Sequence, residues 1–549
     1  MPSASVRPPA AEADLLPRLR VRDPDFWLVS LAWATILFSI AQILLFGFGR
    51  DQGIYAVIAD GIQAGKMPYR DLWDFKPPGI HLVYALAQLL FGRNMLAPRL
   101  LEVAGLTLSI YGFTQLSKAF VGIKRAGLIG GALGALIHAQ LEFWHTCQPE
   151  TFGGYFTVLA LVLTVTEHGR KRRPWAWLAV GALFGGAFLL KPPLGGGALV
   201  CAAYFSRISF TEHGTRRSAV LPVLVMAVGA ALPILACALW FVARGAWGDL
   251  YWTLFEFTPG YTMLGWHGQS APEMFYTALE EGFFKFSALA AFGVIAALVI
   301  SPMHTREREG VFLVLGLVSV HLAGIAMQGK FFPYHYGATL PFVAFLAGIG
   351  LYKLWRRCLA GGSGGVLAFV SFLIVVASMR SGARDLDSFW DRSALRLRYF
   401  LRANSVVARE MLYEKLYAVA DYSLEADARV GREIKRRTPE DASIYVWGFE
   451  PLIYRLSERR PASRFIYNVP QRTSWAGPGP RGELMRDLMR DPPAMIVVQR
   501  YDFFRFVTGE TTDSRAALAG FPKLEAFIHD RYELATSIED FELYERRQK

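Results

Sequence analysis

The chain has 549 residues, of which 53% are hydrophobic, 14% are aromatic and only 19% are charged. This composition excludes an ordinary soluble domain and predicts a polytopic membrane protein. The net charge of +12 does not indicate nucleic-acid binding, because the basic residues stand in short clusters between apolar runs, as topology determinants do. The four cysteines have no close-spaced partners, so they predict neither a disulfide framework nor a zinc site.

Apolar runs of membrane-spanning length occupy most of residues 27–380. The first run follows three arginines and lacks a cleavage site, so residues 1–26 are expected to be a cytoplasmic segment ahead of an uncleaved anchor. About eleven transmembrane helices are predicted, near 27–48, 96–120, 126–141, 151–167, 175–190, 194–206, 218–242, 286–301, 310–327, 337–354 and 364–380.

Loop charge fixes the predicted orientation. Every loop expected on the cytoplasmic side carries Lys or Arg, whereas the short outer loops carry at most one each. The apolar stretch 80–91 is too short to span, and counting it as a span would invert this pattern. We therefore expect the first outer loop, 49–95, to carry interfacial helices on the periplasmic face of a bacterial inner membrane.

The region 381–549 differs in composition, since it is more charged and less apolar. Three β-rich runs, 442–449, 464–468 and 494–499, alternate with segments that have helical patterns. This alternation predicts a periplasmic α/β domain at the C-terminus.

The predicted outer face collects the unusual polar residues. Asp51 follows the first span directly, where a desolvated carboxylate is costly and is usually kept for function. If the substrates are a lipid-linked phosphate donor and a hydroxyl acceptor, a carboxylate must take a proton and cations must neutralise the departing phosphate. The candidate bases are Asp51, Asp71, Asp74 and Glu150. The candidate phosphate-binding cations are Lys76, Lys191, Lys330 and Arg99.

A metal site is the less favoured alternative. The first outer loop contains Asp-Gln-Gly rather than Asp-x-Asp, and His145 and Cys147 have no partners at zinc-ligand spacing. We therefore predict no metal ligands and no cofactor, with a divalent metal kept as an alternative. Outer-face aromatic residues can stack on sugars, but each taken singly also fits the interfacial aromatic belt.

Several of these stretches resemble a known family. "DQGIYAVIADGIQAGKMPYRDLWDFKPPG", "RLLEVAGL", "QPETFGGYF" and "KFFPYHYGATLPFVAFLAG" resemble bacterial membrane glycosyltransferases related to protein O-mannosyltransferases and to the aminoarabinose transferase of lipid A. The resemblance covers roughly residues 25–355 and is most specific in 51–79. It implies the C-type glycosyltransferase fold, polyprenyl-phosphate-sugar donors and inversion at the anomeric carbon.

Position by position, the resemblance implies that Asp51 is the catalytic aspartate and that Tyr55 is the aromatic residue of the same motif. Lys76 and Pro77 match the Lys-Pro associated with the donor phosphate, and Glu150 matches the acidic position of the second outer loop. The family often has Asp-Glu where this chain has Asp51-Gln52, which argues against a carboxylate pair there. The residues expected to contact substrates are Tyr55, Asp71, Asp74, Gln148, Glu150, Tyr334, His335 and Tyr336.

The sequence thus predicts an inverting glycosyltransferase that moves a sugar from a polyprenyl phosphate to a cell-envelope lipid or glycan, at the periplasmic face, in contact with membrane lipids. A protein acceptor is an alternative. A flippase for lipid-linked sugars would show internal repeats, which are absent from the sequence. A metal-dependent glycan-block transferase and a non-catalytic scaffold are the remaining alternatives.

Overall fold

The computed structural model describes residues 23–166, 174–266, 268–284, 293–294, 298, 303–362, 365–366, 384–402, 406–419 and 421–547. Two predicted spans, 286–301 and 364–380, lie almost wholly outside these residues. The predicted number of eleven spans is therefore not confirmed.

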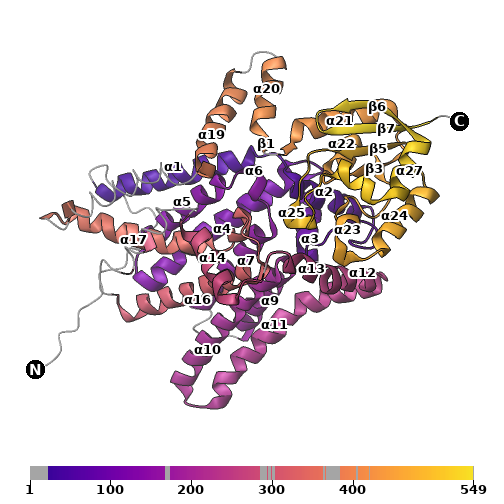
Figure 1. Cartoon of the computed structure of the whole chain (residues 1–549). Coiled ribbons are helices and arrows are strands. Elements are labelled where there is room, and N and C mark those ends of the chain that lie inside the picture. The colour runs from indigo at the N-terminus through magenta and orange to yellow at the C-terminus, as the bar shows by residue number, and fades with distance from the viewer. Residues whose placement is uncertain are drawn as a thin grey trace, which may run out of the picture.

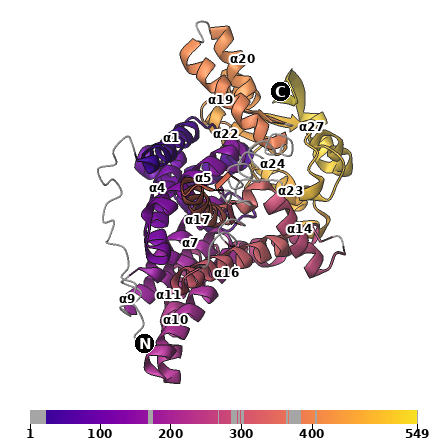
Figure 2. The same cartoon turned by 90° about the vertical axis from the view of Figure 1, so that its left-hand side faces the viewer.

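Long apolar helices form the body of the molecule (Figures 1 and 2). Within the described residues, α1, α11 and α16 are long and apolar enough to cross a membrane, while α3, α7 and α9 are shorter apolar helices. The helices of the body are α1 (Pro24–Leu44), α4 (Leu96–Val121), α5 (Lys124–Gln140), α7 (Pro149–Val165), α9 (Pro174–Leu190), α10 (Gly197–His213), α11 (Arg216–Ala243), α16 (Thr305–Gln328) and α17 (Leu340–Leu359).

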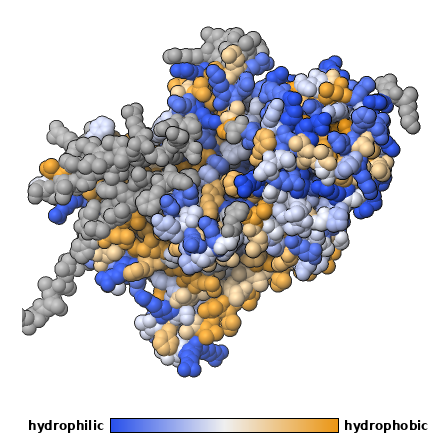
Figure 3. Space-filling model, in the orientation of Figure 1, coloured by the Kyte–Doolittle hydropathy of each residue, from blue (hydrophilic) through white to orange (hydrophobic). Residues whose placement is uncertain are grey.

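The outward faces of these helices are apolar, as a lipid-facing surface requires. Only 22% of the most apolar window of α11 is buried, and leucines such as Leu235 and Leu239 are exposed. Hydrophobic surface gathers over α9, α10 and α11, whereas the C-terminal domain is largely hydrophilic (Figure 3). This division supports insertion of the helical body into a membrane.

Glycines let α9 and α11 approach each other closely. A Cβ atom on Gly181 would lie 2.1 Å from the carbonyl oxygen of Met226, and one on Gly229 would lie 2.1 Å from that of Leu178. Such distances are well inside van der Waals contact, so only hydrogen fits at these positions. Small residues are the usual means of bringing helix backbones together in membranes, where lipid chains compete for apolar contacts.

Shorter elements cover the end of the body that carries the C-terminal domain. In the first loop, α2 (Arg50–Gln63) and α3 (Pro78–Phe91) pack against each other, and α3 exposes Leu86, Leu89 and Leu90 on its outer side. The other short elements of the helical region are α6 (Glu142–His145), η1 (Pro192–Gly196), α12 (Trp247–Tyr251), η2 (Trp252–Phe257), α13 (Thr258–Met263), α14 (Ala271–Phe284) and η3 (Pro333–Tyr336).

A helical pair, α19 (Arg384–Arg402) and α20 (Val406–Leu416), connects the body to the C-terminal domain (Figure 1). The domain contains a sheet with strand order β4-β3-β5-β7-β6, parallel from β4 to β5 and antiparallel from β5 to β6. The sheet strands are β3 (Ser443–Trp447), β4 (Arg460–Pro461), β5 (Met495–Gln499), β6 (Tyr532–Ile538) and β7 (Phe541–Arg546).

Helices and a small β-ladder surround this sheet, so the predicted α/β composition is confirmed. The ladder consists of β1 (Ala418–Val419) and β2 (Tyr422–Ser423), and the helices are α21 (Leu424–Arg437), α22 (Leu452–Ser457), α23 (Val469–Arg472), η4 (Ser474–Ala476), α24 (Gly479–Arg490), α25 (Arg505–Thr508), α26 (Ser514–Ala517), η5 (Leu518–Gly520) and α27 (Pro522–Arg531).

One predicted strand is wrong. Residues 465–468 are buried and Arg464 is half-buried, but the run does not join the sheet, because its backbone groups bond elsewhere. The carbonyl oxygen of Arg464 accepts from Trp73 N at 2.8 Å, and Asn468 N donates to Gly448 O at 3.2 Å. This run is therefore buried between the first loop, where Tyr467 packs on Trp73, and its own domain, where Tyr467 packs on Phe449.

The C-terminal domain docks onto the first loop through buried polar contacts. Tyr467 donates from its hydroxyl to Asp74 Oδ1 at 2.7 Å, across 393 residues of sequence. Arg50 Nε donates to Glu450 Oε1 at 2.7 Å. Gly53 packs so tightly on α22 that a Cβ there would lie 2.8 Å from Leu452 Cβ. The C-terminal domain thus packs directly against the first loop and buries part of it.

The glycine contact between α9 and α11 predicts a specific loss of stability. Gly229→Ala should destabilise the fold by about 1–3 kcal/mol, because the methyl group forces the two backbones apart. Gly248→Ala is the control, since a Cβ at Gly248 meets nothing within 4 Å. Thermal unfolding in detergent checks both variants, and equal midpoints for them would contradict the close packing.

The docking contact of Tyr467 predicts a second loss. Tyr467→Phe should cost about 1.5–3 kcal/mol, because a buried carboxylate loses a hydrogen bond. Tyr445→Phe is the matched control, since the hydroxyl of this fully buried tyrosine has no hydrogen-bond partner among the described residues. Unfolding of both variants under the same conditions measures the difference, and an equally large loss for Tyr445→Phe would refute the role of the hydrogen bond.

Candidate active site

Asp51 lies in the first turn of α2, directly after the chain leaves α1. Its Oδ2 accepts a hydrogen bond of 3.3 Å from Gln148 Nε2, and Gln148 Oε1 in turn accepts from the Tyr55 hydroxyl at 3.0 Å. Lys76 Nζ lies 3.6 Å from Asp51 Oδ1, and the Asp51 side chain is 19% exposed. This partly accessible carboxylate, with a single long side-chain hydrogen bond among the described residues, is able to accept a proton from a substrate hydroxyl.

Lys76 is a buried cation that stands just before α3. Pro77 caps this helix and Pro78 is its first residue, so two fixed backbone angles follow the lysine. Its Nζ lies 4.6 Å from the ring centre of Phe75 and 5.6 Å from that of Tyr55. Burial alone lowers the pKa of Lys76, but the neighbouring carboxylates outweigh burial and raise it. The ammonium group therefore stays charged at neutral pH.

Asp74, two residues before Lys76, is fully buried. Its Oδ1 accepts hydrogen bonds from Phe75 N at 2.8 Å and from Tyr467, and its Oδ2 lies 3.5 Å from His81 Nε2. Burial lowers the pKa of His81 to about 4, against the opposing effect of Asp74. The imidazole is thus neutral at pH 7, and Asp74 supplies negative charge that balances Lys76.

A second charged cluster comes from three other elements. Glu150, in the first turn of α7, lies 2.8 Å from Lys191 Nζ and 3.8 Å from His335 Nε2. His335 Nδ1 bonds to the carbonyl oxygen of Lys330 at 2.6 Å. Burial lowers the pKa of His335 well below its usual value, so its ring is neutral. Lys191 and Glu150 therefore pair with each other, and the neutral His335 adds no charge to this cluster.

Two tyrosines connect the clusters. Burial, followed by the charges of Asp51, Glu150 and Asp74, raises the pKa of Tyr334 well above its usual value. The pKa of Tyr261 is raised in the same way, with Lys76 opposing. Both hydroxyls are neutral at pH 7. The predicted residues Asp51, Tyr55, Asp74, Lys76, Gln148, Glu150, Lys191, Lys330, Tyr334 and His335 thus come together from separate loops and helix ends.

Lys330 differs from the other two lysines. Its Nζ donates to the carbonyl oxygen of Phe506 in α25 at 2.7 Å and lies 4.7 Å from the ring centre of Tyr261. Among the described residues, no carboxylate lies within ion-pair distance of it. Burial lowers the pKa of Lys330 to about 8. An anion bound beside Lys330 would therefore meet a positive charge that no carboxylate of the described residues neutralises.

Two buried residues hold the backbone around Asp51. Gln52 accepts from Gly49 N at 3.0 Å and donates to the carbonyl oxygens of Phe143, Trp144 and Thr146. A glutamate at position 52 has no proton to donate to these carbonyls, which gives a physical reason for the Asp-Gln departure. Arg99 donates to Gly47 O, Phe143 O, Thr146 Oγ1 and Glu102.

Three predicted site residues have their polar groups engaged elsewhere. The guanidinium of Arg99 is fully buried, and its hydrogen bonds go to protein groups, including the carbonyl oxygen of Gly47. Arg99 therefore stabilises the loop before Asp51. Asp71 accepts from Met67 N at 2.7 Å and pairs with the adjacent Arg70, which closes a turn. Tyr336 donates to the carbonyl oxygen of Ala278 at 2.9 Å.

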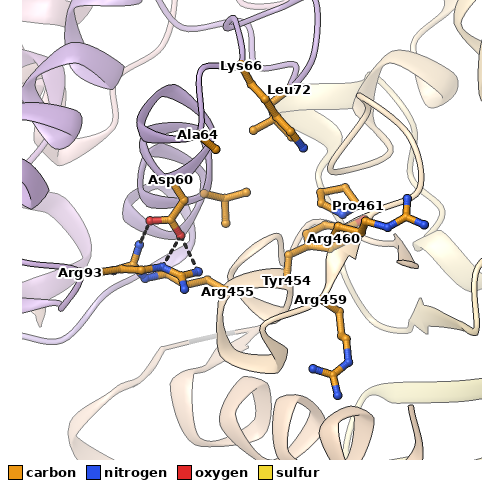
Figure 4. A pocket seen from close by; sticks show the side chains of 12 residues that line it. Asp60, Ala64, Lys66, Leu72, Arg93, Tyr454, Arg455, Arg459, Arg460 and Pro461 are labelled. Atoms are coloured by element: carbon orange, nitrogen blue, oxygen red, sulfur yellow. Dashed lines mark hydrogen bonds and ion pairs between the residues drawn. The ribbon is translucent and has the colours of Figure 1, made fainter. Parts of the chain in front are cut away.

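A separate pocket of about 150 Å³ lies between α2 and the C-terminal domain (Figure 4). Asp60 lies on its wall, nine residues or two and a half turns after Asp51, and therefore on the opposite side of α2. Asp60 pairs with Arg93 and Arg455, while Arg459 and Arg460 bond to groups of their own domain. The Asp60–Arg455 pair therefore holds α22 against α2. We call this pocket the ion-paired seam.

Sequence reasoning missed several residues around the site. Tyr467 and Phe506 come from the C-terminal domain, and only the folded structure reveals their contacts with Asp74 and Lys330. Tyr69 donates to the carbonyl oxygen of Lys76 at 2.7 Å. No group of three or more His, Cys, Asp or Glu side chains in the described ranges is arranged to hold a metal ion.

Comparisons with known proteins match one segment of the chain to a family and match the structure to a known fold. Residues 75–241 match the family described as dolichyl-phosphate-mannose-protein mannosyltransferase. No curated protein matches the chain in sequence. The structure is similar to that of ArnT from Cupriavidus metallidurans bound to undecaprenyl phosphate, with a TM-score of 0.51 and 16% identity over 95% of this chain and 98% of that chain.

The apo structure of the same ArnT gives a TM-score of 0.52 and 15% identity, over the same shares of the two chains. An oligosaccharyltransferase from Archaeoglobus fulgidus, also in the apo form, gives 0.44 and 13% identity, over 96% of this chain and 75% of that chain. The segment match and the fold shared with ArnT confirm the resemblance predicted from the sequence, to the C-type glycosyltransferases of the protein O-mannosyltransferase and aminoarabinose transferase superfamily.

Proposed function

We propose that this protein is an inverting membrane glycosyltransferase that transfers a sugar from a polyprenyl-phosphate donor to a hydroxyl acceptor. The observation that carries the proposal is the grouping of Asp51, Lys76 and the uncompensated Lys330 where the chain leaves its first apolar helix. At the end of this helix, the phosphate of a membrane lipid can contact these residues while its polyprenyl chain stays in the membrane. The family match and the ArnT-like fold agree with the proposal.

In the proposed reaction, Asp51 accepts the proton of the acceptor hydroxyl. The acceptor oxygen then bonds to the anomeric carbon from the face opposite the phosphate, while the bond from that carbon to the phosphate oxygen breaks. The polyprenyl phosphate departs with the electron pair, and the configuration at the anomeric carbon inverts. Asp51 afterwards releases its proton to water.

Two cations are placed to stabilise the departing phosphate. Lys76 Nζ, at 3.6 Å from Asp51 Oδ1, is beyond the usual hydrogen-bond distance, so it is free to turn to a phosphate oxygen. Lys330 gives up only a neutral carbonyl contact when it binds an anion. Lys191 is already paired with Glu150, and we assign to this pair the binding of sugar hydroxyls.

The acceptor is proposed to be a cell-envelope lipid or glycan on the periplasmic side. In this orientation, the basic loops lie in the cytoplasm and the C-terminal domain covers the site from the periplasm. The description of the matched family favours a protein acceptor as the second candidate. Transfer assays that offer envelope lipids and proteins separately distinguish the two.

Removing the base is the direct test of the role of Asp51. Asp51→Asn should lower sugar transfer from a polyprenyl-phosphate donor by about 10²–10⁴-fold, the usual contribution of a general base. Asp71→Asn is the matched control in the same loop, because Asp71 only closes a turn with Arg70, and it should retain near-wild-type turnover. Near-wild-type turnover of Asp51→Asn would contradict the proposed mechanism.

The pKa of Lys330 predicts how phosphate binding depends on pH. Its free-protein pKa of about 8 means that the charged form is lost as the pH rises through 8. A bound phosphate favours the charged form, so affinity for polyprenyl phosphate should fall above pH 8, by at most about tenfold per pH unit for one proton. The phosphate monoester itself is fully ionised in this range.

The arginine variant isolates this effect. Lys330→Arg keeps its charge at all these pH values, so its affinity should stay level between pH 8 and pH 10. Titration of wild type and variant with polyprenyl phosphate in detergent gives both curves. Identical pH profiles for the two proteins would show that Lys330 does not hold the phosphate.

A further inference from the structure

The helix α19 has an apolar stripe on its outer side. Trp390, Ala394, Leu397 and Leu401 follow one another at spacings of four, three and four residues, which places them on one face of a helix. Leu397 is 61% exposed and Leu401 is 71% exposed. An exposed apolar stripe of this kind marks a surface that binds something apolar.

The opposite side of α19 is fixed to the protein, so the direction of the stripe is fixed as well. Arg396 is buried, donates to Gln42 Oε1 at 2.9 Å and pairs with Glu142. Arg392 donates to the carbonyl oxygens of Leu416 and Ala418, each at 2.9 Å. These bonds hold α19 against the end of α1 and against the second helix of the pair, α20.

The stripe begins on the lipid-facing surface of α1. The ring of Trp390 stacks on that of Phe38, with ring centres 6.0 Å apart and planes 12° apart. Phe38 lies six residues before the end of α1, or about 9 Å along the helix. Its neighbour Leu37 is 64% exposed on this helix, which is long and apolar enough to cross a membrane. The stripe therefore continues an apolar surface that already faces lipid.

The other side of the pair faces water. Glu414 of α20 is exposed and lies close enough to Glu539 of the C-terminal domain for its charge to contribute to raising the pKa of Glu539. The pair projects from the body at the junction between the long helices and the C-terminal domain (Figures 1 and 2). One side thus meets the apolar layer while the other meets the aqueous domain.

We propose that α19 and α20 form an interfacial paddle, whose stripe of Trp390, Ala394, Leu397 and Leu401 lies among the acyl chains of the nearby bilayer leaflet. Amphipathic helices at interfaces bury their apolar face about 5–10 Å into this boundary. The paddle holds the C-terminal domain at a constant height over the membrane surface. This role does not depend on the chemistry at Asp51.

A fluorescent probe at single cysteines tests the paddle directly. The full-length protein, with Cys358→Ser to remove the partly exposed native thiol, carries Leu401→Cys or the control Glu414→Cys, each labelled with an environment-sensitive dye. The labelled proteins are placed in vesicles of phosphatidylethanolamine and phosphatidylglycerol with acyl-chain quenchers. Emission at position 401 should be blue-shifted and quenched severalfold more than at position 414.

Water-like, unquenched emission at position 401 would overturn the proposal. Blue-shifted emission that lipid quenchers do not reach would also overturn it, because it would indicate that a second copy of the chain covers the stripe. The double variant Leu397→Asp, Leu401→Asp gives an independent readout. It should unfold at the wild-type temperature in detergent yet leave the C-terminal domain more open to protease in vesicles, and unchanged protection there would contradict the anchoring role.

Discussion

A buried lysine close to an apolar layer must be compensated by negative charge, and Lys76 shows how this chain does so. Asp51 Oδ1 lies 3.6 Å from its Nζ, Asp74 joins Asp51 in raising its pKa, and the rings of Phe75 and Tyr55 lie beside it. Each carboxylate needs its own support in turn. Gln148 supports Asp51, while Tyr467 and the neutral His81 surround Asp74. The need to balance the buried charge of Lys76 therefore explains the local arrangement of the site.

The same balance explains why the C-terminal domain belongs to the site. Tyr467 reaches Asp74, the carbonyl oxygen of Phe506 holds Lys330, and Glu450 pairs with Arg50 beside Asp51. A buried charge left without its partner is costly, so these contacts fix the domain over the first loop. Lys330 is the exception, because a neutral carbonyl leaves its charge available to an incoming anion.

Sequence patterns locate the apolar helices, the α/β composition of the C-terminal domain and the loops that meet at the site, because these depend on local composition. They cannot show which polar groups pair after folding. Arg99 has the position of a phosphate ligand in sequence, yet its burial commits it to backbone carbonyls. Residues 464–468 have a strand pattern, yet their backbone groups bond to Trp73 of the first loop and to Gly448 rather than to a strand of the sheet. Tyr467 needs a contact across 393 residues.

In the proposed reaction, Lys76 and Lys330 receive the phosphate of a polyprenyl lipid while Asp51 faces the acceptor. A crystal or cryo-EM structure of the protein with bound polyprenyl phosphate would locate the phosphate relative to these three residues. We expect phosphate oxygens within hydrogen-bond distance of both lysine nitrogens, with Lys330 released from the carbonyl oxygen of Phe506. A phosphate bound instead in the seam lined by Asp60 and Arg455, with Lys330 still on Phe506, would contradict this expectation.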